Sequence, residues 1–377
     1  MFFDITLYIA LTIFGIGMLY KLYSWLHNRV GLASQDISTS RRILSAIKGC
    51  ILTIFSIKIF VLIKAFILDV VLQLRLLKDG RGFYVWLMHM CIYGGFTFLL
   101  LMHGLDKVIT SSLFIDYYPT VNPFLFLRNL FGVLVLIGLA LAVIRRTILK
   151  KHDVTNSATD YYAIIILTVI MLSGFLLEGL KMNSYSTYQS MVEEYAFLQN
   201  EEARALETFW VKEFGVVSPN KQETFGAEAL ALGKELSDIS CAGCHSSAKW
   251  AFIGYATAKI SRPVALHLDR AGVPVLMWYI HFLSCFFGLA YLPFSKMFHL
   301  FATPVSILVN AAVDEGKSDP ANVATKLSIE LDGCRHGGAC HLGCPIRQKR
   351  QQGIDAVKQC EPLLGYLAEN LRVGIDK

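Results

Sequence analysis

Long apolar runs, separated by short polar segments, dominate the chain. Six runs come close to the ~20 apolar residues that a membrane-spanning helix needs: they lie near 5–26, 49–72, 83–105, 124–144, 160–181 and 273–313. The first run ends in a basic cluster without an A-x-A-like cleavage site, so we expect a retained helix instead of a signal peptide. The pattern predicts an all-α, polytopic membrane bundle of five or six spans.

The composition supports this interpretation. Of the 377 residues, 54% are hydrophobic and 17% are charged, and the mean hydropathy is +0.50, whereas soluble domains are about 25% charged. The net charge of +6 comes partly from Lys and Arg beside the apolar runs, where basic residues set membrane topology. We therefore expect a protein that contacts the lipid bilayer and does not bind nucleic acid.

Basic residues also predict the orientation, because they collect in cytoplasmic loops. The loop after the fourth run carries four of them: Arg145, Arg146, Lys150 and Lys151. The segment 104–123 is nearly uncharged and is expected outside. Membrane helices in 1–182 would then precede an outer insert at 183–270, a last membrane helix at 271–313 and a cytoplasmic tail at 314–377.

The second run is ambiguous, because basic residues stand on both sides of it and Lys58 and Lys64 interrupt it. Both flanks are therefore expected on the inner side. We favour a helix that lies at, or dips into, the inner face. That arrangement leaves five spans with the N-terminus outside, and a sixth span through 49–72 is the alternative.

Four histidines lie inside two of the apolar runs. His89 and His103 are 14 residues apart, which corresponds to about 21 Å of helical rise and about −40° of rotation. His281 and His299 are 18 residues apart, almost five turns or about 27 Å. Each pair shares a helix face. Because the two runs cross in opposite directions, His103 is expected near His281 on the outer side and His89 near His299 on the inner side.

Ionisable residues inside membrane spans are candidates for function, because burying them without a partner is costly. Two facing histidines at each of two levels would make two bis-histidine sites, which is typical of haem b in a helical bundle. Any single histidine could instead hydrogen-bond a neighbouring carbonyl. A carboxylate-histidine metal centre fits less well, because neither run contains Asp or Glu between its histidines.

The outer insert contains a C-x-x-C-H motif, formed by Cys241, Cys244 and His245. This motif is typical of covalent haem c attachment, with two thioether bonds and an axial histidine. Residues 227–240 read as a helix that leads into it. The alternatives are a redox-active dithiol, a zinc site and chance. For the distal ligand we favour His267, ahead of methionines in the insert.

The tail carries a second cysteine pattern. Its cysteines are Cys334, Cys340, Cys344 and Cys360. The bacterial iron–sulfur run is C-x2-C-x2-C-x3-C-P, and residues 334–345 match it except that Gly337 occupies the second cysteine position. A [4Fe-4S] cluster, another metal site and a remnant without metal all stay open.

These residues resemble the membrane cytochrome b family typified by the gamma subunit of respiratory nitrate reductase. The similarity rests on VVLQLRLLKDGRGFYVWLMH, which ends at His89, on the 18-residue interval from His281 to His299, and on YLPFSKMFHLFATP. It covers roughly residues 40–315 and is closer to relatives that serve membrane-bound heterodisulfide reductase and sulfite-reduction complexes. The resemblance implies that His89, His103, His281 and His299 ligate two b haems.

By this resemblance the chain is an electron-transfer subunit of a respiratory oxidoreductase in a prokaryotic inner membrane, not catalytic alone. Its expected partners are quinone, an outer-side c-type cytochrome and a cytoplasmic iron–sulfur subunit of the heterodisulfide reductase type. The insert would be periplasmic. The alternatives are a quinol dehydrogenase subunit that feeds a nitrate-reductase-like enzyme and a haem-based redox sensor, which would need an output domain.

Overall fold

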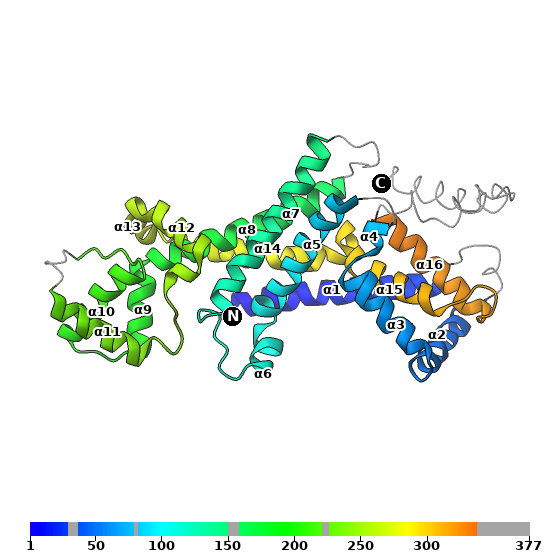
Figure 1. Cartoon of the computed structure of the whole chain (residues 1–377), viewed down its shortest axis with the longest axis horizontal. Helices are drawn as coiled ribbons and strands as arrows, with labels where there is room; N and C mark the ends of the chain where they lie inside the picture. The colour runs from blue at the N-terminus through cyan, green and yellow to red at the C-terminus, as the bar shows by residue number, and fades with distance from the viewer. Residues whose placement is uncertain (29–36, 79–81, 150–157, 221–225, 338–377) are drawn as a thin grey trace. The chain divides into compact units, whose positions relative to one another are not determined.

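The computed structural model describes residues 1–28, 37–78, 82–149, 158–220 and 226–337. Within these segments every regular element is a helix (Figure 1). Five helical stretches are long and apolar enough to cross a membrane: Phe2–His27, Gly82–Gly104, Phe124–Thr147, Ala158–Asn183 and Val273–Phe294. The prediction of an all-helical, multi-pass membrane protein is therefore confirmed.

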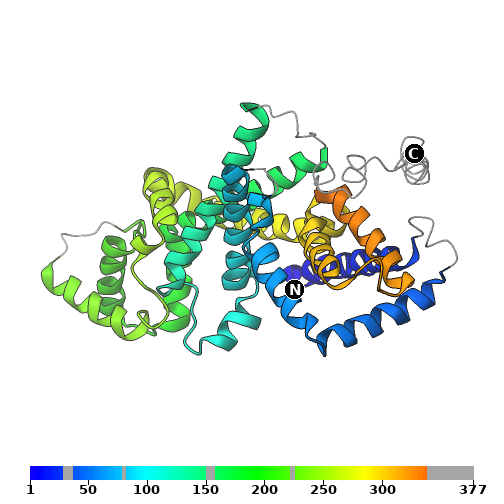
Figure 2. The same cartoon turned by 45° about the vertical axis from the view of Figure 1, so that its right-hand side comes forward.

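The chain divides into two compact units. The first combines Met1–Trp86, Arg145–Ala163 and Phe286–Lys377, and the second combines Leu87–Ile144 and Ile164–Cys285. In the first unit, α15 (His299–Ala312) and α16 (Pro320–Gly337) lie side by side (Figure 2). Their shared core includes one residue of α1 (Phe2–His27); its buried members are Trp25, Phe298, Ala302 and Ile329.

The ambiguous second run is not one straight helix. It falls on α2 (Thr39–Ile54) and on α3 (Lys58–Ala65) with the turn that follows, and the chain bends by 94° at the break between them. The described residues thus hold five straight candidate spans, and a sixth only if this bent pair is counted as one. Such a bend fits a helix that dips into one face of the membrane.

One basic residue that flanks this run has an unexpected place. Arg42 is among the largest fully buried side chains of the structure. Its guanidinium donates to the carbonyls of Trp25 at 2.7 Å and Asn28 at 2.6 Å, at the end of α1, and to the carbonyl of Ala324 and the hydroxyl of Thr325 on α16, each at 3.1 Å. A cation at a helix C-terminus is favourable, so Arg42 joins three helices of the first unit.

We expect Arg42→Ala to lower the free energy of unfolding by at least about 3 kcal/mol, because it leaves several buried acceptors without donors. The measurement is the thermal unfolding midpoint of the detergent-solubilised protein. Arg41→Ala is the matched control, since its neighbouring side chain is exposed on the same helix. Equal midpoints for the two variants would contradict this role of Arg42.

In the second unit, glycines bring helix backbones close together. A Cβ atom at Gly95 of α5 (Gly82–Leu99) would lie 2.8 Å from the Phe131 carbonyl oxygen, and one at Gly138 would lie 2.9 Å from the Ile92 nitrogen. Phe131 and Gly138 belong to α7 (Phe124–Thr147). The close packing of α5 on α7 therefore depends on glycine at both positions.

The predicted insert is a group of short helices (Figure 1). They are α9 (Tyr185–Tyr195), α10 (Asn200–Glu213), α11 (Ala227–Ser240), α12 (Phe252–Ser261) and α13 (Ala265–Arg270). The bounds of α11 confirm the helix predicted to lead into the C-x-x-C-H motif. The core under α9, α10 and α11 is apolar; its buried members are Tyr188, Leu206, Trp210, Val216 and Cys241.

Both histidine-bearing runs depart from regular helix. After α5 the chain continues as a π-helical turn at Leu100–Gly104, which contains His103 and shifts it relative to the expected rotation from His89. The last run is not a single helix. α14 (Val273–Tyr291) gives way to 3-10 turns, and α15 begins at His299. Pro293 in the first of these turns cannot continue a helix, so the five-turn spacing does not hold.

Candidate functional site

Two of the four predicted haem-ligand histidines face each other in the second unit. The ring centres of His103 and His281 are 6.2 Å apart, and the ring planes are inclined by 37°. His103 lies in the π-helical turn after α5, and His281 lies in the middle of α14. The structure therefore brings together the two histidines that the sequence pairs on the outer side, called the outer pair below.

Their spacing fits one metal ion between the rings. A metal–imidazole bond is about 2.0 Å long and the ring radius adds about 1 Å, so two imidazoles on opposite sides of one ion have centres about 6 Å apart. The side chain of His103 is exposed and that of His281 is half-buried, so both rings are accessible. The outer pair thus has the geometry that a bis-histidine haem requires.

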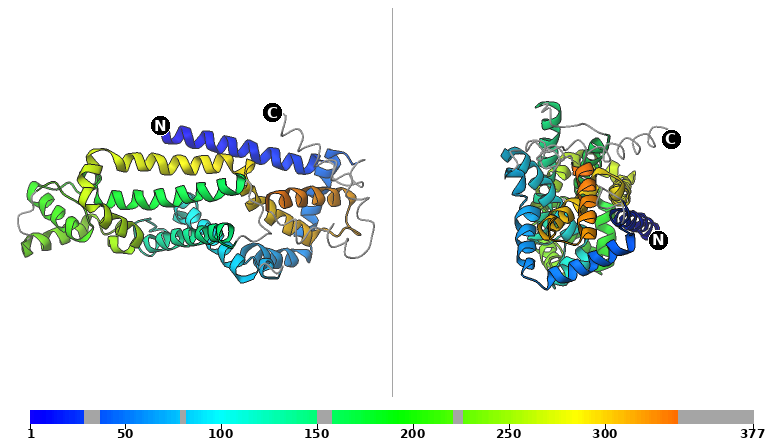
Figure 3. Two further views of the ribbon diagram at one scale, coloured as in Figure 1. Left: turned by 90° about the horizontal axis from the view of Figure 1, so that it is seen from above. Right: turned by 90° about the vertical axis from the view of Figure 1, so that its right-hand side faces the viewer.

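The partner of His281 on α8 (Ala158–Asn183), which runs alongside α14 (Figure 3), favours one tautomer. The Ser173 hydroxyl donates to the Ile170 carbonyl at 3.1 Å and lies 3.1 Å from Nδ1 of His281. Because its proton is used, the hydroxyl oxygen can accept a proton from Nδ1, which leaves Nε2 free as a ligand. A Cβ atom at Gly174 would lie 3.1 Å from Cε1 of the same ring, so glycine makes room for it.

We expect Ser173→Ala to weaken haem binding at this pair by about 10-fold or more, as loss of an outer partner of a metal ligand commonly does. The haem that stays bound should have a more positive midpoint potential, because an unbonded Nδ1 makes the imidazole a weaker donor to ferric iron. An optical redox titration measures both effects. Thr168→Val on the same helix, whose hydroxyl bonds only its own helix carbonyl, should leave the titration unchanged.

Polar side chains fix the turn that contains His103. A π-helical turn at a helix end leaves carbonyls without helical partners. Here the Thr110 hydroxyl donates to the Leu101 carbonyl at 2.7 Å, and the Tyr117 hydroxyl donates to the Met102 carbonyl. These two bonds satisfy the backbone on the N-terminal side of His103 and fix the position of its ring.

Charged groups surround the outer pair. The cations of Arg128 on α7 and Lys181 on α8 act electrostatically on both histidine rings. Nearby, Glu178 accepts a 2.9 Å hydrogen bond from the Asn129 amide, and Asn129 in turn accepts from the backbone amide of Ile253 at 3.0 Å. Haem carboxylates need cationic partners, and Arg128 and Lys181 are suitable ones. No sequence pattern indicates this group.

The inner histidines lie in different units, His89 in the second and His299 in the first, and their pairing stays a prediction. His299 opens α15, and its Nδ1 lies 2.7 Å from the Lys296 carbonyl. Nδ1 therefore donates to this carbonyl, which leaves Nε2 free as it is in His281. Each of these two histidines is thus prepared for a metal at Nε2.

The C-x-x-C-H motif forms a turn at the end of α11. The amides of Cys244 and His245 both donate to the Cys241 carbonyl, at 3.1 and 2.9 Å. Reactive dithiol cysteines are typically at helix N-termini, where the pKa falls. Cys241 instead caps the C-terminus of its helix, and burial raises the pKa of its thiol. Both facts disfavour the dithiol alternative.

Three hydrogen bonds hold the motif against the segment that precedes α7. The Thr120 hydroxyl donates to the Cys244 carbonyl, and the Ser246 amide donates to the Thr120 carbonyl at 3.0 Å. The Asn122 amide donates to the Ser246 hydroxyl at 3.0 Å. Since Tyr117 of the same segment bonds next to His103, one short stretch of chain contacts both predicted cofactor sites.

The surroundings of His245 fit a buried cofactor. Its ring packs edge-on against Trp210, with ring centres 5.5 Å apart, and burial lowers the pKa of His245, which favours the neutral form that ligates metals. Tyr188 packs in the same core, and its buried hydroxyl has no hydrogen-bond partner among the described residues. A haem carboxylate could supply the acceptor that this hydroxyl lacks.

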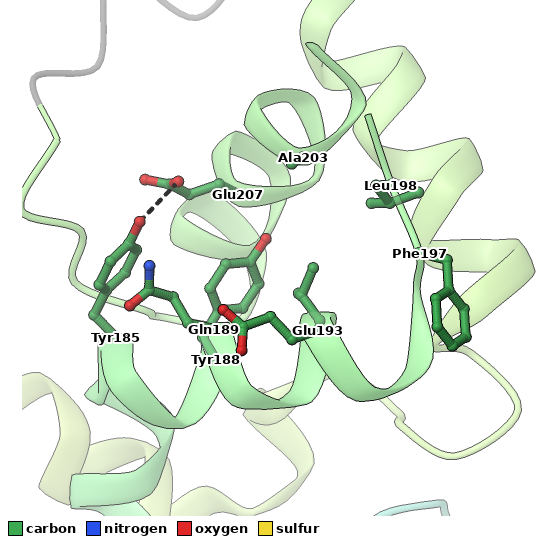
Figure 4. A pocket seen from close by; sticks show the side chains of 9 residues that line it. Tyr185, Tyr188, Gln189, Glu193, Phe197, Leu198, Ala203 and Glu207 are labelled. Carbon is green, nitrogen blue, oxygen red and sulfur yellow. Dashed lines mark hydrogen bonds between the residues drawn. The ribbon is translucent and has the colours of Figure 1, made fainter. Parts of the chain in front are cut away.

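Tyr188 also lines a cavity of about 290 Å³ between α9 and α10. Figure 4 shows it beside Glu193 and Glu207, the latter accepting a 3.2 Å hydrogen bond from Tyr185. The cavity adjoins the core that holds Cys241. The predicted distal ligand, His267, is exposed on α13, and it stays a prediction.

The cysteine-rich tail lies largely outside the described residues. Cys334 falls within α16, whereas Cys340, Cys344 and Cys360 lie beyond the last described residue. In the parts of the chain that are described, no three His, Cys, Asp or Glu side chains form a metal site. The predicted cluster therefore stays a prediction.

Comparison with known proteins finds relatives over part of the chain. One is a subunit of dihydromethanophenazine:CoB–CoM heterodisulfide reductase from Methanosarcina barkeri; the identity is 29% over 126 residues, which cover 32% of this chain and only 47%, about half, of the relative. The corresponding Methanosarcina acetivorans protein is 23% identical over 257 residues, or 66% of each chain. No protein-family profile and no solved structure matches. The chain is thus a distant homologue, over part of its length, of this membrane cytochrome b subunit of heterodisulfide reductase.

Proposed function

We propose that this chain is the membrane cytochrome subunit of a respiratory oxidoreductase and binds two b haems and one c haem. It would exchange electrons among quinone, an outer-side c-type cytochrome and a cytoplasmic iron–sulfur subunit of the heterodisulfide reductase type. The observation that carries this proposal is the facing pair of His103 and His281, 6.2 Å apart. Homology to the Methanosarcina subunit supports it, because that relationship implies a b-type haem and a role in a membrane oxidoreductase.

The proposal gives each part of the outer site a role. A bound haem supplies one-electron exchange at its iron. His103 and His281 would ligate that iron, Ser173 would keep Nδ1 of His281 protonated, and Arg128 and Lys181 would balance the charge of the haem carboxylates. His89 and His299 would do the same as the outer pair for the inner haem.

The motif in the insert would hold the c haem, with Cys241 and Cys244 as attachment points and His245 as an axial ligand. The hydrogen bonds from the Thr120 segment support a fixed distance between this site and the outer pair. Rigid spacing of cofactors favours electron transfer over ligand sensing. The tail cysteines, whether or not they hold a cluster, would face the iron–sulfur partner.

The quinol dehydrogenase alternative differs only in its partner, a nitrate-reductase-like enzyme, and the similarity to the Methanosarcina proteins favours the heterodisulfide type. The sensor alternative needs haems that do not exchange electrons with one another.

Anaerobic stopped-flow mixing of the purified oxidised chain with menadiol tests the proposal. We expect the b-haem α-bands to appear and the c-haem band to rise at a related rate, since all haems belong to one conducting chain. If dithionite reduces the haems but menadiol does not, and menadione fails to reoxidise them, the quinone-linked role is wrong. If the c haem never equilibrates with the b haems, the sensor alternative gains.

A further inference from the structure

Three charged side chains of the first unit meet at one point. The carboxylate of Asp160, near the start of α8, is only 2% exposed. It accepts from Nη2 of Arg146, near the end of α7, at 3.2 Å and lies 2.5 Å from the Lys296 ammonium. The two cations are themselves largely buried, with side-chain exposures of 19% and 24%. This cluster is called the Asp160 triad below.

The Asp160 triad is joined to a predicted haem ligand. Lys296 stands three residues before His299, and its carbonyl accepts the 2.7 Å hydrogen bond from Nδ1 of His299. The same residue thus holds the histidine with its backbone and Asp160 with its side chain. Any group bound at Nε2 of His299 lies within the field of the triad.

The charges of the triad do not balance. Two cations meet one carboxylate, and Nη1 of Arg146 is buried without a hydrogen-bond partner among the described residues. A buried donor without an acceptor is destabilising, so an acceptor is expected beside Arg146. Arginine pairs with carboxylates through two parallel hydrogen bonds, and an anionic carboxylate would also neutralise the remaining positive charge.

We infer that Arg146 and Lys296 bind a carboxylate of the inner haem and that Asp160 is a positioning residue that holds both cations in place. This inference rests on the proposed function, since it takes His299 as a haem ligand. Nη1 of Arg146 supplies the donor and Lys296 the second positive charge. Membrane topology alone would account for a basic residue at position 146, but not for its buried and paired position.

Midpoint potentials of the haems in the full-length chain test the inference. Lys296→Gln and Arg146→Gln remove positive charge and should shift one b haem to a more negative potential. Asp160→Asn removes negative charge and should shift the same haem to a more positive potential. The other b haem should not move. Lys326→Gln, which breaks the buried pair of Lys326 with Glu315, is the control and should shift neither.

Two b haems with unshifted potentials in all three variants would overturn the inference alone, and the triad would be a structural ion cluster. A wild-type chain with fewer than two b haems would overturn the proposed function with it. If a charge-removing variant does not fold, Arg146→Lys keeps the charge but loses the paired donors. With haem labelled by ¹³C at its carboxylates, redox-difference infrared bands should shift in that variant, and unshifted bands would contradict the inference.

Discussion

A chain that carries Cys241→Ala and Cys244→Ala together is expected to lose all of the haem that survives denaturation. Thioether bonds need both thiols, and without them a haem at His245 would dissociate in detergent. Haem staining of a denaturing gel measures this directly: the wild-type band stains and the variant band does not. The b haems should remain, because their predicted ligands are in other helices.

Cys50→Ala is the matched control, since Cys50 is an exposed free thiol on α2 and its loss should leave the staining unchanged. An unstained wild-type band, with Cys241 and Cys244 both open to alkylation, would contradict haem c attachment. The dithiol or zinc alternatives would then have to explain the motif.

Substitution of either outer histidine should remove one b haem completely. Bis-histidine iron depends on both ligands, and the 6.2 Å spacing places the rings of His103 and His281 directly opposite each other. We expect His281→Ala to lower extractable haem b from two per chain to one, with covalent haem c retained. The pyridine haemochrome spectrum of the purified variant gives the count.

His27→Ala is the control, because His27 stacks on Tyr23 and bonds Thr39 within the first unit, and its loss should leave both b haems in place. Added imidazole should restore the lost haem in His281→Gly, since free imidazole can occupy the position of the missing ring. Unchanged haem b in both His281 variants would contradict the assignment of this residue.

The sequence predicted the outer pair because long apolar runs set the depth and direction of each helix. Depth and direction are enough to bring His103 and His281 to the same level. The helical phase was less predictable. The π-helical turn around His103 is held by bonds from Thr110 and Tyr117, and no periodicity in the run itself indicates them.

Residues that support the ligands could not be found from the sequence. Ser173 resembles any serine in a membrane helix, where the hydroxyl commonly bonds its own backbone. Its role appears only when α14 places His281 beside it. Arg42 and Arg146 likewise read as inside-facing charges, yet both are buried and bonded across the first unit.

The last apolar run carries a sequence signal for its own interruption. Pro293 indicates a kink between His281 and His299, and the structure ends α14 at Tyr291. The 18-residue interval therefore does not measure a helical rise. The pairing of His299 with His89 depends on tertiary structure and cannot be derived from spacing.

The most direct test of the account is a haem inventory of the purified wild-type protein, by pyridine haemochrome spectroscopy before and after acid–acetone extraction. We predict two extractable haem b and one haem c that stays with the chain. A protein without haem, or one whose only haem is covalent, would contradict the cytochrome assignment and leave the facing histidines of the second unit without their proposed ligand.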